Sequence, residues 1–279
     1  MPILSPADHT FFEENGYVVI PNAVPQENLD AVVDAIWWFL GMDRNDPEDW
    51  YREPHRTGGM VEIYQHQALW NNRQSPRIYQ AFSEIRGTEK LWVTIDRACM
   101  KPPQHPAHPE YDHKGFIHWD ADVTKRPLRF GVQGVLYLSD TTADQGGFQC
   151  IPGGHIGVEE WVDSLPPDCD PRRPDVTGKN VTPIPGKAGD LLIWHSLLPH
   201  GNGHNVSNRP RFAQFISMVP AREENEEYRQ ERISQWRDHR PPGNKVFPGD
   251  PRGWEEQYET TAELTPLGRK LLGLDPWSG

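Results

Sequence analysis

The chain has 279 residues, enough for one large domain or two small ones. Its hydrophobic fraction of 36% includes 11 Trp and 10 Phe, so a sizeable core is expected. A net charge of −12 argues against a nucleic-acid partner, and no apolar run reaches the ~20 residues that a membrane helix needs. Three cysteines without CxxC spacing and the lack of a secretory signal favour the cytoplasm. The expected partner is a small-molecule substrate.

Helix signals dominate the first 90 residues. Ser5-Pro6 and Ser75-Pro76 each combine a capping hydroxyl with a proline at the first helical position, which is typical of a helix start. Apolar residues recur at helical spacing from 25 to 40, so a further amphipathic helix is predicted there. The segment 17–20 is predicted to be a short strand.

Short runs of strand-forming residues replace the helical pattern after residue 87. Turn signals such as Gly146-Gly147 and Pro152-Gly-Gly154 separate these runs, which is typical of an antiparallel β-rich core. The predicted strands cover 91–98, 116–120, 130–138, 147–151, 191–198 and 212–219.

The last sixty residues are helical again by pattern. The segment 223–240 is densely charged, with few apolar positions, and is expected to be a solvated helix. Thr265-Pro266 begins a last helix that Gly273 ends. No composition break indicates a second domain. We therefore predict a single β-rich α+β domain over 1–279, with a helical region at 1–90, a core at about 91–220 and a helical tail at 221–279.

The most informative residues are His118, Asp120 and His200. His118 and Asp120 are two apart, so their side chains leave the same face of a strand. His200 follows another apolar run, and a barrel of two sheets would bring these strand ends together. Two imidazoles and one carboxylate form the facial arrangement of non-haem iron oxygenases, which leaves the opposite face of the metal open.

Other side chains compete for these roles. Asp122 is an alternative carboxylate, but its offset from His118 is less favourable for a shared strand face. His105, His108 and His113 lie in a proline-rich stretch and are interpreted as loop or pocket-lining residues. His195, inside an apolar run, is interpreted as a packed residue or a hydrogen-bond partner of a metal ligand.

A cationic side chain follows the second histidine at Arg211. It begins an otherwise apolar run, and its planar guanidinium can pair bidentately with a carboxylate. The alternative for Arg211 is a surface ion pair. Arg209, two residues earlier, is the competing cation.

These motifs resemble the phytanoyl-CoA dioxygenase family of Fe(II)- and 2-oxoglutarate-dependent oxygenases. The resemblance runs from the segment 11–21, which begins Phe11-Phe-Glu-Glu-Asn-Gly-Tyr17, to the segment 264–274, and the segment from His200 to Arg211 is its strongest part. It implies a double-stranded β-helix, or jelly roll, flanked by helices. It also implies that His118, Asp120 and His200 hold Fe(II), that Arg211 binds the far carboxylate of 2-oxoglutarate, and that O2 is the second co-substrate.

The sequence departs from the family pattern in the strand 131–138, which lacks a tryptophan often found there. Gln133, Tyr137 and Arg97 therefore become candidates for lining the co-substrate pocket, with ordinary sheet packing as the alternative for each. The carboxylate at Asp120 argues against halogenation, because related halogenases leave this position small so that chloride can bind the metal.

The expected reaction is oxidation of a C–H bond in a small, polar metabolite or natural-product intermediate, by hydroxylation or by desaturation or cyclisation. Glu62, Tyr64 and His66 lie in a segment that could fold over the metal, so they are candidate substrate contacts. Two alternatives are a non-catalytic jelly-roll binding module and a zinc-dependent hydrolase. Oxygen-dependent succinate formation from 2-oxoglutarate separates the proposed reaction from both.

Overall fold

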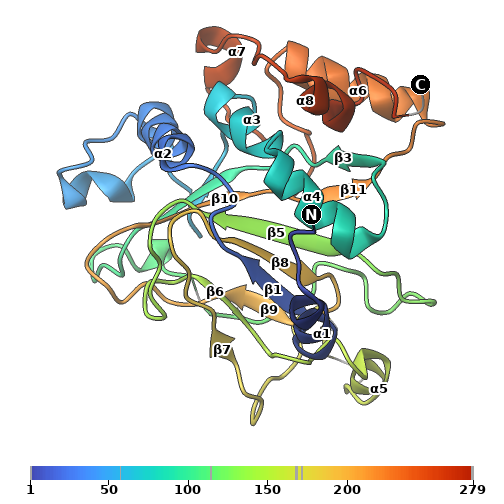
Figure 1. Ribbon diagram of the computed structural model, residues 1–279. Helices are drawn as coiled ribbons and strands as arrows, with labels where there is room; N and C mark the ends of the chain where they lie inside the picture. Colours follow the sequence, from blue (N-terminus) through green and yellow to red (C-terminus); the bar gives the residue numbers. More distant parts are fainter. Residues whose placement is uncertain (1, 57, 114, 167–168, 171, 278–279) are drawn as a thin grey trace.

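A computed structural model describes residues 2–56, 58–113, 115–166, 169–170 and 172–277. Its core is built from antiparallel sheets (Figure 1). The main sheet has the order β1 (Tyr17–Ile20), β8 (Leu191–His195), β5 (Val132–Tyr137), β10 (Arg211–Phe215), β4 (Ala98–Lys101) and β2 (Met60–Val61). A second sheet has the order β7 (Thr182–Pro183), β6 (Phe148–Cys150) and β9 (His200–Asn202). A third sheet pairs β11 (Met218–Pro220) with β3 (Leu91–Val93).

The main sheet and the β7-β6-β9 sheet face each other across an apolar inner core. Side chains of alternate residues from β5, such as Val135 and Tyr137, meet Phe148 and Cys150 of the smaller sheet. This arrangement of two facing sheets is the jelly roll, or double-stranded β-helix, predicted from the sequence, and the fold class is confirmed.

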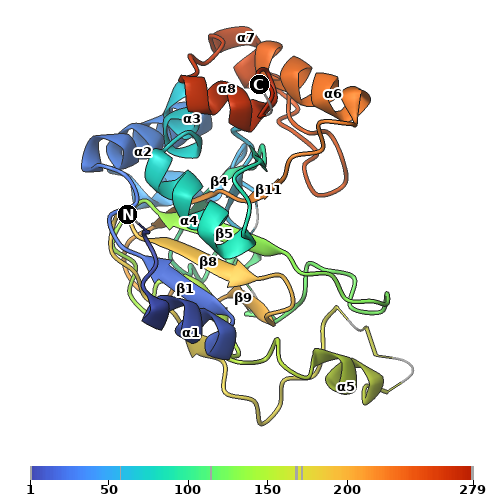
Figure 2. The same cartoon turned by 45° about the vertical axis from the view of Figure 1, so that its right-hand side comes forward.

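Helices cover the other face of the main sheet. In two views, α2 (Gln26–Leu40), α3 (Gln67–Arg73), α4 (Pro76–Arg86), α6 (Glu226–Arg237), α7 (Trp254–Tyr258) and α8 (Pro266–Leu272) lie on this side (Figures 1 and 2). Leu136 and Ile193, from the outer face of the sheet, share one core with Ile36 and Phe82 of the helices. Both faces of the main sheet are therefore buried, which holds its strands rigidly at the site.

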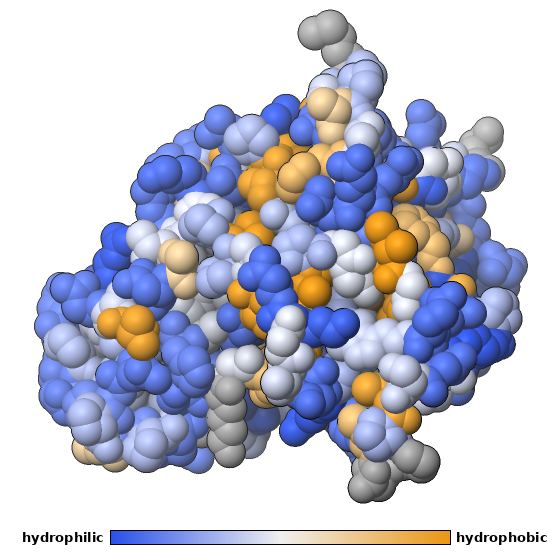
Figure 3. All heavy atoms as spheres, turned by 90° about the horizontal axis from the view of Figure 1, so that it is seen from below, coloured by the Kyte–Doolittle hydropathy of each residue, from blue (hydrophilic) through white to orange (hydrophobic). Residues whose placement is uncertain are grey.

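The surface on the side of the smaller sheet is mainly hydrophilic, with hydrophobic side chains in separate small groups (Figure 3). The short helices α1 (Pro6–Asn15) and α5 (Val158–Asp163) lie away from the layer of helices above the sheet (Figure 2). Among the described residues, no helix combines the length and apolar character that crossing a bilayer requires.

The helix starts predicted from capping signals are confirmed. Ser5 and Asp8 form a reciprocal capping box at the start of α1, and Gly16 ends that helix with a φ of 78°. The side chain of Ser75 accepts a hydrogen bond from the backbone N–H of the third residue of α4, and that of Thr265 accepts one from the N–H of the third residue of α8. These ends depend on neighbouring residues alone, which explains why sequence patterns locate them.

Three predicted strands need correction. The segments 91–98 and 212–219 are each divided between two strands, β3 with β4 and β10 with β11, because the chain enters the main sheet only at Ala98 and leaves it at Ile216. Thr94 donates its backbone N–H to the Ser217 carbonyl at this point. The segment 116–120 forms no strand, and only His118 makes an isolated bridge to β9.

The tail helix α6 was expected to be solvated, but one of its charged side chains is buried. Arg232 donates to the carbonyls of Leu271 and Leu272 at the end of α8, and to the carbonyl of Val93. The carbonyls of Leu271 and Leu272 are among those that the helix end leaves without intrahelical partners. A long-range contact of this kind leaves no periodic signal in the sequence.

A buried carboxylate joins the C-terminal tail to α3. Glu255 of α7 accepts hydrogen bonds from the backbone N–H groups of Tyr64, Gln65 and His66, just before α3. We predict that Glu255→Ala lowers the free energy of unfolding by about 3 kcal/mol, because buried donors lose their acceptor. Urea denaturation measures this change. Glu256→Ala, on the exposed side of the same helix, is the control, and equal effects of the two substitutions would contradict the prediction.

Candidate metal centre

His118, Asp120 and His200 meet at one end of the jelly roll. Their ligand atoms all lie within 4.8 Å of one another. Nε2 of His118 is 3.4 Å from Oδ1 of Asp120, and Nε2 of His200 is 3.4 Å from its Oδ2. Fe(II) in facial sites is bound by this donor set, two imidazole nitrogens and one carboxylate that converge on a single point. The predicted proximity of the three side chains is confirmed.

The backbone and its neighbours hold the two imidazoles in place. His118 and His200 exchange backbone hydrogen bonds of 2.8 and 3.0 Å, so their Cα atoms face each other across the two chain segments. The ring of His200 places Nδ1 2.9 Å from the Leu198 carbonyl and stacks on Phe148. With Nδ1 paired in this way, Nε2 is left free to bind a metal.

Gln133 orients the carboxylate. From the open end of β5, its amide donates a 2.8 Å hydrogen bond to Oδ2 of Asp120. Burial alone would raise the pKa of Asp120, but hydrogen bonds from His118, His200 and Gln133 outweigh burial and lower the pKa. Asp120 is therefore ionised at neutral pH, as a metal ligand must be. Gln133, predicted as a co-substrate contact, contacts the candidate metal ligand Asp120 directly.

A cavity of about 430 Å³ opens above the three residues. Its wall contains His118, Asp120 and His200, which together form the metal-binding group, and Gln133. The rest of the wall is a largely aromatic surface with a few polar groups. The aromatic and aliphatic side chains come from both sheets and from the C-terminal tail: Met60, Phe116, Phe148, Trp194, Phe215, Val246 and Phe247.

The competing candidates lie elsewhere, except for one histidine. Asp122 is exposed, bonds to Thr124 and Lys125, and does not belong to the metal-binding group. His105 and His108 pack against Tyr51 outside the cavity. The ring of His195 packs against Phe12 and Phe130. His113 lines the cavity, as the pocket-lining interpretation expects.

Arg211 and Lys101 form a pair of buried cations behind the metal-binding group. They are direct partners in the β10–β4 register, on the face that points into the jelly roll. Arg211 donates to the Gly146 carbonyl and, at 2.8 Å, to Asn202, a residue that lines the cavity. Lys101 donates to the Gly203 carbonyl. Lys101 was missed by the sequence analysis, although a lysine inside the run Ala98-Cys-Met-Lys101 was a usable signal.

The charges of this pair are not balanced by protein. In the described part of the chain, no carboxylate lies within 4.0 Å of Arg211 or Lys101, and Nε of Arg211 is buried without a partner. Burial, and then the charge of Arg211, lowers the pKa of Lys101 to about 7. Burial and the charges of both cations lower the pKa of His113 to about 4, so the pair acts on the cavity. A carboxylate bound here would compensate the pair, so these residues fit the far end of 2-oxoglutarate.

Two other co-substrate candidates have different surroundings. Tyr137 lies in the inner core, and its hydroxyl donates to the Ile184 carbonyl at 2.7 Å instead of facing the cavity. Arg97 does line the cavity, but it faces the C-terminal tail. It donates to the Val246 carbonyl and lies 3.6 Å from Glu62. Tyr137 nevertheless lies near Arg211: burial raises its pKa, and the charge of Arg211 opposes this rise. Arg97 is directed away from the buried cations.

The substrate candidates Glu62, Tyr64 and His66 do not line the metal cavity. The Tyr64 hydroxyl donates to Glu62, and both side chains are almost completely buried. His66 caps α3 and lies 3.5 Å from Glu259. Met60, in the edge strand β2, is the part of the expected covering segment that lines the cavity. Residues 64–66 of that segment face the tail, because Glu255 accepts hydrogen bonds from their backbone N–H groups.

A jelly roll that holds two histidines and a carboxylate at its open end defines the class of non-haem metal-dependent oxygenases. The comparison with known proteins agrees. A family model described as phytanoyl-CoA dioxygenase (PhyH) matches residues 12–213. The chain therefore belongs to the phytanoyl-CoA dioxygenase family, and it is a 2-oxoglutarate-dependent iron dioxygenase.

Individual relatives are distant. A Dictyostelium discoideum protein assigned to the phytanoyl-CoA dioxygenases is 27% identical, over 76% of this chain and 74% of its own. An ectoine dioxygenase of Bordetella bronchiseptica is 24% identical, with 74% and 72% covered. The fold is shared with EvdO2 of Micromonospora carbonacea var. aurantiaca, solved with 2-oxoglutarate, at a TM-score of 0.55 and 19% identity, covering 78% and 91% of the two chains.

The contact between Gln133 and Asp120 can be tested through metal affinity. We predict that Gln133→Leu raises the dissociation constant for Fe(II) about tenfold, because the carboxylate loses the partner that orients it. Anaerobic titration measures this constant. Gln230→Leu, on the exposed side of α6, is the control. An Fe(II) affinity of Gln133→Leu equal to that of the wild type would show that Asp120 is held without Gln133.

Proposed function

We propose that this dioxygenase oxidises a C–H bond of a small metabolite or natural-product intermediate, with hydroxylation as the default outcome. In this proposal His118, Asp120 and His200 hold Fe(II), while Arg211 and Lys101 hold the far carboxylate of 2-oxoglutarate. The observation that carries the proposal is the pair of buried cations without a protein carboxylate, beside a facial metal-binding group. Neither a zinc hydrolase nor a structural metal site accounts for that pair.

The chain provides positions and a secluded space for this chemistry. Iron, 2-oxoglutarate and O2 together supply an oxidant able to break a C–H bond, with succinate and carbon dioxide as co-products. The cations fix one end of the diacid, and Gln133 keeps the Asp120 carboxylate turned toward the two histidines. The aromatic wall excludes bulk water, which protects the protein and the substrate from unproductive oxidation.

The dimensions and composition of the cavity support a small substrate. The cavity of about 430 Å³ has to hold 2-oxoglutarate as well as the substrate, so the remaining space suits a molecule of modest size and no long chain. Asp120 holds the position that a halide would need, which supports oxygen transfer over halogenation. Three free thiols, at Cys99, Cys150 and Cys169, are consistent with a reducing compartment such as the cytoplasm.

The proposed reaction is tested by succinate formation. We expect the purified protein, loaded anaerobically with Fe(II), to convert 2-oxoglutarate into succinate only after O2 is admitted. His200→Ala should abolish this turnover, because the metal loses a ligand. Chromatographic quantification of succinate provides the measurement. Succinate formed without O2, or at the wild-type rate by His200→Ala, would rule out the proposed reaction and its ligand set.

Arg211 is tested separately from the metal. We predict that Arg211→Met raises the concentration of 2-oxoglutarate required for half-maximal turnover about 100-fold, because a buried charge-assisted pair is lost. Fe(II) affinity should change little, since Arg211 does not contact the metal-binding side chains. Arg209→Met is the matched control, because that guanidinium is exposed. If Arg209→Met has the larger effect, the carboxylate binds at the other arginine.

A further inference from the structure

A second carboxylate, Asp96, lies in the wall of the metal cavity and takes no part in holding the metal. It belongs to the short segment between β3 and β4, where the chain passes from one sheet to the other. Its side chain is half-buried, with 22% of the area exposed. Asp96 and Asp120 line the same cavity; burial raises the pKa of Asp96, and the charge of Asp120 adds to this rise.

The hydrogen-bonding capacity of Asp96 is largely unused. One oxygen, Oδ1, accepts a 2.7 Å hydrogen bond from the backbone N–H of Arg97. Nε of Arg97 lies 3.6 Å from the same oxygen, too far for a hydrogen bond. Within the described ranges, Oδ2 has no hydrogen bond. A carboxylate offers about four acceptor positions, so Asp96 presents free acceptors to the cavity.

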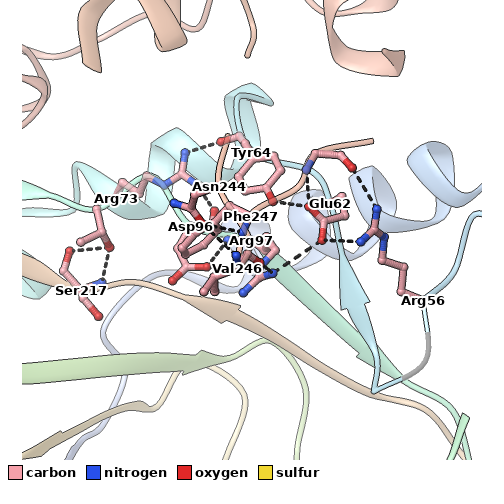
Figure 4. A network of polar contacts seen from close by, with 12 residues as sticks. Arg56, Glu62, Tyr64, Arg73, Asp96, Arg97, Ser217, Asn244, Val246 and Phe247 are labelled. Carbon is pink, nitrogen blue, oxygen red and sulfur yellow. Dashed lines mark hydrogen bonds and ion pairs between the residues drawn. The ribbon is translucent and has the colours of Figure 1, made fainter. Parts of the chain in front are cut away.

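The neighbouring guanidinium is already matched by other groups (Figure 4). Arg97 donates to the Val246 carbonyl, stacks 4.4 Å above the Phe247 ring and lies 3.6 Å from Glu62. Glu62 also accepts from the N–H of Gly249 and lies 3.7 Å from Arg56. The positive charge of Arg97 is thus shared with Glu62, and it does not fully neutralise Asp96.

The cavity around Asp96 is suited to a positively charged group. Phe116, Phe148, Phe215 and Phe247 give it an apolar wall against which a carbon skeleton can pack. The rings of Phe247 and Phe116 already stack on Arg97 and Arg173, so Asp96 is the group in this wall that would attract a further cation. Burial raises the pKa of Asp96, and the opposing charges of Arg97 and Arg73 do not reverse this rise. A cation beside Asp96 would therefore stabilise an ionised carboxylate that the protein alone compensates poorly.

We propose that the substrate carries a protonated amine, which donates a hydrogen bond to Asp96 while its carbon skeleton packs against the phenylalanine rings beside the metal. This inference rests on the proposed function, because it names the class of substrate for the same cavity. In this proposal Asp96 binds the substrate, whereas Arg97 and Glu62 stabilise the neighbouring wall of the cavity through Val246 and Gly249.

Three simple probes of similar shape test the proposal. Phenethylamine, phenethyl alcohol and hydrocinnamate present a cationic donor, a neutral donor and an anion on the same aromatic skeleton. Calorimetric titration into the anaerobic protein loaded with Fe(II) and 2-oxoglutarate measures their affinities. We expect phenethylamine to bind at least about tenfold more tightly than the alcohol, since a charge-assisted hydrogen bond is the stronger one. Hydrocinnamate should bind most weakly.

Two variants assign the preference to Asp96. Asp96→Asn should reduce phenethylamine affinity about tenfold and leave the alcohol near its wild-type affinity, because only the charge is removed. Asp34→Asn, which removes an exposed carboxylate on α2, should leave the order of affinities unchanged. Melting curves and Fe(II) affinity establish that both variants are folded.

The outcomes separate this inference from the proposed function. The amine site is overturned if hydrocinnamate binds as well as phenethylamine, if Asp96→Asn keeps the amine preference, or if no probe binds at millimolar concentration. Amine binding that depends on Asp96, in a protein that forms no succinate, would support the site and reject the proposed oxidation. Succinate formation without amine binding would support the oxidation and reject the site.

Discussion

The metal-binding group depends on one backbone contact, the reciprocal pair of hydrogen bonds between His118 and His200. His200 begins β9, which pairs with β6 at the edge of the smaller sheet, whereas His118 lies in a segment without regular structure. The bridge therefore transfers the rigidity of the sheet to the loop that carries Asp120. Because the ligands must converge within a few ångströms, a small shift of this loop would separate the carboxylate from both imidazoles.

The rest of the site follows from an uneven distribution of charge around that bridge. Lys101 and Arg211 place positive charge deep in the jelly roll, and no described carboxylate pairs with them. Such an arrangement costs folding free energy, which the apolar cores on both faces of the main sheet offset. A bound diacid would recover some of that cost, so ligand binding should be coupled to stability.

Sequence patterns predicted the helix caps, which depend on local order, and these are confirmed. The jelly-roll class was expected from the resemblance to a known family, and the meeting of His118, Asp120 and His200 from their spacing together with that resemblance; both are confirmed. Other long-range contacts carried no such motif and could not be predicted. Lys101 becomes a partner of Arg211 only through strand register, and His66 is directed to Glu259 by the packing of the tail. The division of 91–98 into two strands also depends on pairing with β11, far along the chain.

The C-terminal tail extends beyond the residues matched by the family model, which end at 213, yet it completes the cavity. Val246 and Phe247 lie in the cavity wall, where Asn244 accepts hydrogen bonds from their backbone N–H groups and Arg97 binds the Val246 carbonyl. Glu62 and Arg56 hold Gly249 by its N–H and its carbonyl. The metal-binding end of the cavity is thus built from residues within the matched segment, whereas Val246 and Phe247 of the opposite wall lie outside it. Substrate selection is therefore expected to reside in the tail and in Asp96 beneath it.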